Sequence, residues 1–161
     1  MNIDAVQQAI ARGLAFCSTR QLPHGEFTTL IGSDLDLSDG VWDSSVFVTA
    51  TVLSSLEFVG GAAVPLIDRG LDFLESEREP GGLWRYYSSR QFKHTRIPPD
   101  LDDTCCVSLV LRRHGRPVPR NRRYILANRD ADGRFGTWMI PTAHTGMLFR
   151  VTRAIGDWRA A

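Results

Sequence analysis

Apolar residues recur along the chain at the three- and four-residue spacing of amphipathic helices, with polar or glycine-containing stretches between them. This pattern predicts six helices, at about 3–20, 42–59, 63–78, 102–115, 120–130 and 143–156. We therefore expect a single all-α domain made of three helical hairpins, with an uncertain tail over residues 139–161.

An internal repeat supports the hairpin division. Shifting the sequence by 57 positions matches an Arg-Gly-Leu triplet, a glycine and two aromatic positions: Arg12-Gly13-Leu14 with Arg69-Gly70-Leu71, Phe16 with Phe73, Gly25 with Gly82, and Phe27 with Trp84. A weaker third copy has Tyr124, Gly133 and Phe135 at the same places. We expect each glycine to make a turn and each ring to pack between helices.

Three carboxylates crowd into four positions before the fourth predicted helix, in the segment Pro98-Pro99-Asp100-Leu101-Asp102-Asp103-Thr104. Asp100 suits the N-cap, and Gly115 suits the position where this helix ends. Like charges this close cannot all ionise cheaply, so at least one pKa should rise. We expect the helix N-terminus to keep Asp100 and Asp103 charged while the proton is shared or held by Asp102. A purely structural capping cluster is the alternative.

The segment Asp100-Leu101-Asp102-Asp103-Thr104 resembles the DxDD(T) acid motif of class II terpene cyclases and squalene-hopene cyclases. The three copies, near 9–30, 66–87 and 120–138, resemble degenerate QW repeats. The usual glutamine is present only as Gln21, with Arg78 and with Arg129 or Asp130 near that place in the other copies. The resemblance implies an α/α toroid, of which three hairpins would form a partial, half barrel.

The same resemblance implies roles for individual side chains. Asp102 would be the general acid that protonates a terminal isoprenoid double bond or epoxide, tuned by Asp100 and Asp103 and helped by Thr104. Aromatic rings would line the substrate cavity and stabilise carbocations, and the candidates are Tyr86, Tyr87, Phe92 and Trp138. Histidines that could support the acid or act as the final base are His94 and His144. The substrate would be a linear polyprenoid, which needs no cofactor if squalene-like and magnesium if a prenyl diphosphate.

Two other interpretations stay open. Asp103, Cys105 and His144 supply the ligand types of the zinc site in protein prenyltransferase β subunits, to which this pattern is similar. Alternatively, the domain is a non-catalytic interaction module or a truncated remnant, because three hairpins do not obviously enclose a dry cavity. The basic run from Arg112 to Arg123 is expected to be a solvated hairpin tip, or else an edge that contacts a diphosphate.

Composition agrees with one soluble domain of 161 residues, 43% hydrophobic, with a net charge of +1. Three cysteines form no disulfide framework, and the sequence contains neither a membrane-length apolar run nor a signal peptide, so the expected compartment is the cytoplasm, with peripheral membrane contact left open. Asp34, Asp36 and Asp39 fail the spacing of a calcium loop and predict a solvated loop that caps the helix near Trp42. Exposed repeat edges indicate a homodimer or a partner chain, and no nucleic-acid motif is present.

Overall fold

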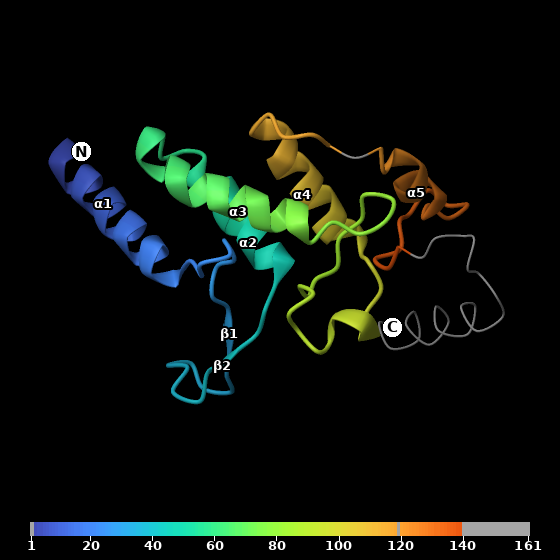
Figure 1. Ribbon diagram of the computed structural model, residues 1–161, viewed down its shortest axis with the longest axis horizontal. Coiled ribbons are helices and arrows are strands. Elements are labelled where there is room, and N and C mark those ends of the chain that lie inside the picture. The colour runs from blue at the N-terminus through green and yellow to red at the C-terminus, as the bar shows by residue number, and fades with distance from the viewer. Residues whose placement is uncertain (1, 119, 140–161) are drawn as a thin grey trace.

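The computed structural model describes residues 2–118 and 120–139, and this part of the chain is mostly helical (Figure 1). Its α-helices are α1 (Ile3–Arg20), α2 (Val46–Leu56), α3 (Val64–Ser76), α4 (Leu101–Arg113) and α5 (Arg122–Ala127). Two short strands, β1 (Leu30–Ile31) and β2 (Val41–Trp42), pair antiparallel, and single 3₁₀ turns occur at Gly61–Ala63 and His94–Arg96. The expected helical class is confirmed, while the predicted helix at 143–156 lies outside the described residues.

The helix expected to begin at residue 42 begins instead at Val46. Trp42 pairs with Leu30 in the small hairpin, and the Ser45 side chain caps α2 by accepting a hydrogen bond from the Val48 N–H at 3.3 Å. The stretch 32–40 is a solvated loop as predicted, but it closes a β-hairpin and does not cap α2. Alternation of apolar residues over two positions per strand is too short a signal to predict such a hairpin.

The core lies between α2, α3 and α4, with α2 and α4 packed side by side behind α3 (Figure 1). Trp84 is fully buried in this core and donates its indole N–H to the Leu74 carbonyl at 2.7 Å, which confirms its predicted packing role. Close approach of α2 and α3 depends on Gly70, because a Cβ there would lie 2.7 Å from the Leu53 side chain. By contrast, α1 contains no buried residue among those described.

The three sequence copies fold into the same backbone turn. In each copy one residue, two or three positions after the end of the helix, makes both backbone hydrogen bonds of the turn. Its carbonyl accepts from the N–H of the turn glycine, and its N–H donates to the carbonyl of the residue that follows this glycine. The bonds are Gly25 N–H to Leu22 O (2.9 Å) and Leu22 N–H to Glu26 O (2.7 Å); Gly82 to Glu79 (3.0 Å) and Glu79 to Leu83 (3.0 Å); Gly133 to Asp130 (3.1 Å) and Asp130 to Arg134 (2.8 Å). The glycines have φ values of +100°, +73° and +84°, a region that other residues resist.

The structure also shows which side chain replaces the missing glutamine. Gln21 donates to the carbonyl of the turn glycine Gly25 at 3.0 Å, and Arg129 makes the same bond to Gly133 at 3.1 Å. Arg78, the other sequence candidate, is exposed. The third copy is therefore a variant of the first turn, although its ring Phe135 is 45% exposed whereas Phe27 and Trp84 are buried.

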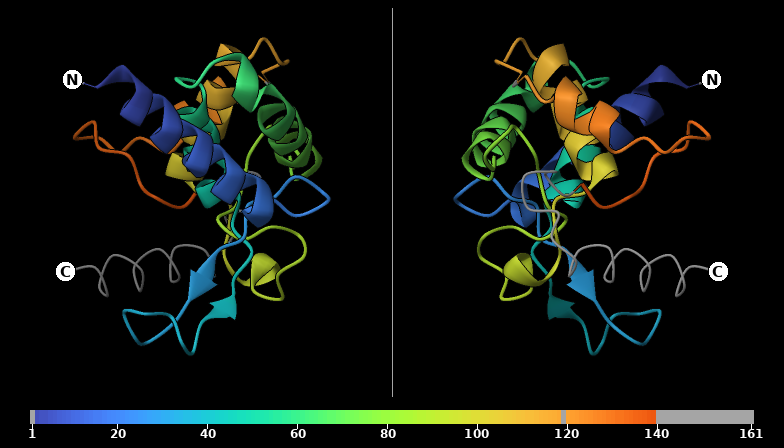
Figure 2. Two further views of the ribbon diagram at one scale, coloured as in Figure 1. Left: turned by 90° about the vertical axis from the view of Figure 1, so that its left-hand side faces the viewer. Right: turned by 90° about the vertical axis from the view of Figure 1, so that its right-hand side faces the viewer.

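The chain between each turn and the next helix forms a layer of loops at one end of the helices. The β1–β2 hairpin and the loop containing the His94–Arg96 turn both extend from this end of the helices, where α2 and α4 begin (Figures 1 and 2). Equivalent contacts join the copies here, since Val46 N–H donates to Tyr86 O at 2.9 Å and Leu101 N–H donates to Thr137 O at 2.7 Å. The acid motif thus occupies the same place in its copy that Ser45 to Thr49 occupy in the preceding one.

Candidate active site at the start of α4

Asp100 caps α4, as predicted. Its side chain accepts a hydrogen bond from the Asp103 N–H at 2.9 Å, and its backbone has the extended conformation typical of an N-cap. The Asp100 N–H donates to Trp84 O at 3.1 Å, while the Met139 N–H donates to Pro99 O at 2.7 Å. Backbone from the second and third repeats therefore holds the first turn of α4 on both sides.

Thr104 has a structural role at this site. Its hydroxyl oxygen accepts a hydrogen bond from the Trp84 N–H at 3.1 Å, and its side chain is fully buried. Thr49 does the same in the first copy, where it accepts from the Phe27 N–H at 3.1 Å. Because the same contact recurs where no acid motif exists, Thr104 positions the helix and is not specific to proton chemistry.

The three carboxyl groups differ sharply in their access to solvent. Asp102 is exposed, Asp100 is 7% exposed and Asp103 is 1% exposed. Neither side-chain oxygen of Asp103 receives a hydrogen bond from an N–H or hydroxyl donor among the described residues. An ionised carboxylate without donors in this position would be costly, so the neutral acid is favoured.

Burial raises the pKa of Asp103 to about 9, and hydrogen bonding with Asp100 and the charges of Asp100 and Asp102 act in the same direction. Burial also raises the pKa of Asp100, to about 6, although hydrogen bonding from Asp103 opposes the rise and hydrogen bonding with Asp102 adds to it. The sequence expectation that Asp100 and Asp103 stay charged is therefore wrong for Asp103. The helix N-terminus favours the anion, but desolvation outweighs it.

The three carboxyl groups therefore differ in how firmly they hold a proton, because burial raises the pKa of Asp103, the most buried of them, further than that of Asp100, while Asp102 is exposed. At neutral pH the cluster retains at least one proton, which is the equipment of a Brønsted acid.

The predicted aromatic residues separate into two groups. Tyr86 and Tyr87 meet edge to face with centroids 5.0 Å apart, and Phe47 stacks on Tyr86 at 6.3 Å, so they lie at the start of α2. Trp138 lies beside the acid motif, because its backbone forms an isolated β-bridge with Asp100. Its side chain is 42% exposed. Phe92 is 69% exposed and lies against Lys93 and Arg96.

His94 belongs to a group of side chains whose hydrogen bonds and ion pairs stabilise the loop that precedes the acid motif. Its Nδ1 contacts Tyr87 O at 2.9 Å and its Nε2 contacts the Glu79 carboxylate at 3.2 Å. Arg85 pairs with the same Glu79 and also donates to Ile97 O. His94 thus supports the loop, and the other candidate base, His144, lies outside the described residues.

The residues proposed for zinc are not assembled in the described part of the chain, which contains no cluster of three metal-ligating side chains. Asp103 is buried, whereas Cys105 is exposed on another side of α4. Burial, aided by the charge of Asp102, raises the pKa of Cys105. The third proposed ligand, His144, is not described.

A buried polar network at the start of α2 was not anticipated from the sequence. Glu26 is fully buried and accepts hydrogen bonds from the Ser44 hydroxyl at 2.6 Å and the Ser45 N–H at 2.9 Å, with His24 at 2.9 Å. Nearby, Gln91 donates to the Asp43 carboxylate at 2.9 Å. The bonds from Glu26 to Ser44 and Ser45 and from Gln91 to Asp43 join residues 18 to 48 positions apart, so only the fold brings these residues together.

Comparisons with protein-family models, curated proteins and solved structures found no match to this chain. Within the described residues, each helix is too short or too polar to cross a lipid bilayer. Any assignment of function must therefore rest on the acid cluster, the repeated turns and the surfaces around them.

Proposed function

We propose that this protein is a class II terpene cyclase-like enzyme, which starts cyclisation of a linear isoprenoid by protonating a terminal double bond or epoxide. The observation that carries the proposal is the neutral, donor-free Asp103 carboxyl within the Asp100–Asp102–Asp103 cluster. A group that stays protonated at neutral pH beside two further carboxyls meets the first requirement of a Brønsted acid catalyst.

In the proposed reaction Asp102, the exposed member, transfers its proton to the terminal alkene carbon, leaving a carboxylate and a tertiary carbocation. For an epoxide the proton goes to the ring oxygen, and the C–O bond then opens. Asp103, whose neutral form burial favours, is the source of the replacement proton, and Asp100 tunes the cluster. The cyclised cation then loses a proton, which returns to the carboxylate left on the acid cluster, so that protons and charge balance over one turnover. Asp103 is thus the proton reservoir and Asp102 the residue that contacts substrate.

The repeated turns support the structural half of the proposal. Three helix–turn units with the same glycine geometry are what a toroid-type hairpin repeat requires, and the buried rings Phe27 and Trp84 act as the packing aromatics of such repeats. The chain would supply three hairpins of an α/α barrel, with a second copy or another chain completing it. Enclosure by that partner would keep water from the cations. The proposal places the reaction in the cytoplasm, with substrate delivered from membranes.

The test is product analysis by gas chromatography and mass spectrometry after incubation with squalene, oxidosqualene and geranylgeranyl diphosphate, the last with and without magnesium. We expect a cyclised product from at least one substrate, no product from Asp102→Asn, and strongly reduced product from Asp103→Asn. The matched control is Asp36→Asn, which removes an exposed carboxylate from the 32–40 loop. Cyclised product that survives in Asp102→Asn would contradict the assigned role.

A further inference from the structure

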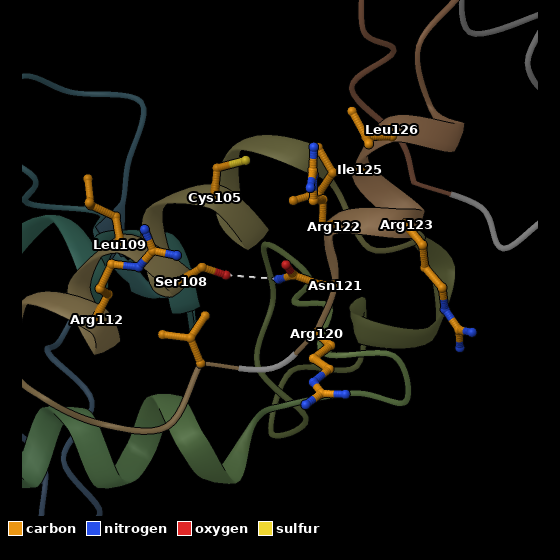
Figure 3. Close-up of a pocket in the computed structure, with 11 residues that line it drawn as sticks. Cys105, Ser108, Leu109, Arg112, Arg120, Asn121, Arg122, Arg123, Ile125 and Leu126 are labelled. Carbon is orange, nitrogen blue, oxygen red and sulfur yellow. Dashed lines mark hydrogen bonds between the residues drawn. The ribbon is translucent and has the colours of Figure 1, made fainter.

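A groove of about 1050 Å³ lies between α4 and α5 (Figure 3). Its border carries arginines, but the side chains of Arg112, Arg120 and Arg123 point in different directions and do not meet at one place (Figure 3). Its apolar lining comes from both helices and their connection: Cys105, Leu109, Val118, Ile125 and Leu126. The groove is therefore best understood as an apolar packing surface.

The two sides of this groove repeat the packing of α2 and α3. The shared caps and threonine contacts align α2 with α4 at a shift of 55 positions, and the turn glycines align α3 with α5 at a shift of 51. These shifts match Leu53 with Ser108, and Gly70 with Asn121. A Cβ on Gly70 would lie 2.7 Å from the Leu53 side chain, and at the matching place Asn121 donates to the Ser108 hydroxyl at 2.9 Å. Thus α5 lies against α4 as α3 lies against α2.

In the preceding repeat a third helix completes the packing. Ala50 and Leu53 of α2 are fully buried, since α2 packs against both α3 and α4. At the matching positions of α4, Cys105 is exposed and Ser108 is only half-buried. The described residues therefore supply α5 as the counterpart of α3, but they supply no counterpart of α4 to cover this surface.

A pattern in the sequence identifies that counterpart. Both α2 and α4 contain a threonine that is followed eleven positions later by a glycine, and the same spacing occurs once more after α5. The three pairs are Thr49 and Gly60, Thr104 and Gly115, and Thr145 and Gly156. In the first two pairs the threonine hydroxyl accepts the N–H of a buried ring residue, and the glycine has a φ of +83° or +68° after the end of the helix. The third pair lies outside the described residues and marks 143–156 as the sequence counterpart of α2 and α4.

The side chains of this segment suit an apolar groove. At helical spacing Leu148, Val151 and Ile155 share one side, while Arg150 and Arg153 fall on the opposite side. The alignment matches the first two aliphatic residues with two valines of α4 that are buried against the core. The segment therefore has one side to bury and one charged side to leave in solvent.

The path of the chain brings this segment to the groove. The Met139 N–H donates to Pro99 O at 2.7 Å, so the last described residue lies directly before the first turn of α4. Only residues 140–142 separate it from the segment, and connections of this length commonly join packed elements. So short a tether gives the segment a high effective concentration at the groove, which favours it over a separate chain.

We propose that residues 143–156 pack as a helix in the α4–α5 groove, beside α4 in the way that α4 packs beside α2. The groove is then an internal surface of the third repeat, and Cys105 and Leu109 belong to a core shared by α4, α5 and this segment. This inference follows from the repeats alone and does not depend on the proposed reaction.

The first test measures the rate at which a maleimide labels Cys105 in the full chain carrying Cys17→Ala and Cys106→Ala. A covered thiol reacts only in molecules whose covering segment has opened. We expect Leu148→Asp to accelerate labelling by about tenfold or more, because it places a charge on the packed side. Arg150→Asp introduces the same side chain on the opposite side and should leave the rate within about twofold. Equal rates with and without Leu148→Asp overturn the proposal.

A cross-link locates the segment without placing a charge on its packed side. In the same background, Val151→Cys is treated with a bismaleimide whose reach matches the separation of packed helices, about 8–10 Å. We expect a cross-link to Cys105 within one chain, and a several-fold lower yield from Arg153→Cys on the opposite side. Equal yields from the two positions overturn the proposal, as do cross-links that form only between chains, because a second copy would then supply the segment. Circular dichroism melts check that each variant is folded.

Discussion

Burial determines the chemistry of the acid motif one side chain at a time. Three adjacent carboxyl groups have identical intrinsic acidity, yet the first turn of α4 directs Asp103 into the core and leaves Asp102 in solvent. The difference in environment separates their roles, because desolvation stabilises the neutral form of the buried group only. The same separation of two carboxyls by environment is how enzymes obtain an acid and a base from one residue type.

The raised pKa of Asp103 predicts how stability depends on pH. Folded Asp103, with a pKa of about 9, binds a proton more tightly than the unfolded chain does, for which the ordinary value is 3.8. The folded state therefore holds more protons between about pH 4 and pH 9, and the contribution of Asp103 to stability falls as pH rises through that window. We expect Asp103→Asn to flatten the decline in melting temperature above neutral pH, measured by circular dichroism from pH 5 to pH 9.

Asp36→Asn provides the reference for that experiment, because Asp36 is exposed and its pKa is lowered by hydrogen bonds from Ser38. Its stability contribution is present above the ordinary carboxyl range and is lost only in acid, so its removal leaves the decline above neutral pH in place. If the Asp103→Asn and wild-type curves run parallel from pH 5 to pH 9, then Asp103 is not a buried neutral acid.

The sequence predicted where α4 begins and ends more accurately than it predicted which carboxyl group of the acid motif is protonated. Asp100 and Gly115 act through local geometry that depends on a few neighbouring residues, and both take the expected places, Gly115 with a φ of +68°. The ionisation state of Asp103 depends on how deeply other parts of the chain bury its side chain, and this burial cannot be deduced from the local sequence. For the same reason Tyr86 and Tyr87, close to the motif in sequence, lie at the start of α2.

At the scale of elements, the repeated turn is the unit that organises the chain. Its glycine spacing could be read from the sequence, because a positive φ restricts the residue at each of these positions. The β1–β2 hairpin and the shorter α2 could not, because two-residue strands carry almost no periodic signal and the start of α2 is fixed by Ser45 and the distant Glu26.

The turn itself can be tested at Gly25. A Cβ at this position would lie 2.0 Å from the Arg69 carbonyl oxygen, and the φ of +100° disfavours any other residue. We expect Gly25→Ala to lower the free energy of unfolding by about 1–3 kcal/mol from backbone strain, with the steric conflict adding to it. Urea denaturation followed by tryptophan fluorescence measures the change.

Gly13 is the matched control because it belongs to the same repeat copy but lies inside α1, where a Cβ would meet no atom within 4 Å. Gly13→Ala should leave stability unchanged or raise it by about 0.5–1 kcal/mol through better helix propensity. Equal effects of the two substitutions would mean that the Gly25 turn does not hold α1 to α3.

At the scale of the whole molecule, the first element of the repeat series, α1, leaves apolar surface uncovered. On α1 the exposed residues Ile3, Val6 and Ile10 follow helical spacing, and a groove of about 320 Å³ lies between α1, α2 and the β1 strand. Interior repeats bury such surface against a neighbour, whereas terminal repeats normally carry a polar outer face. An apolar terminal face is therefore a surface that favours association.

We accordingly expect the full chain to self-associate, and light scattering coupled to size-exclusion chromatography should give a mass above 18.0 kDa that falls on dilution. Ile10→Glu should shift the protein to the monomer with little change in melting temperature, because Ile10 is 42% exposed and contributes little to the described core. Gln8→Glu, which adds the same charge at an exposed α1 position, should keep the wild-type mass. A wild-type chain that remains at 18.0 kDa at every concentration would exclude closure by a second copy, and a cyclase would then require another chain to cover α1.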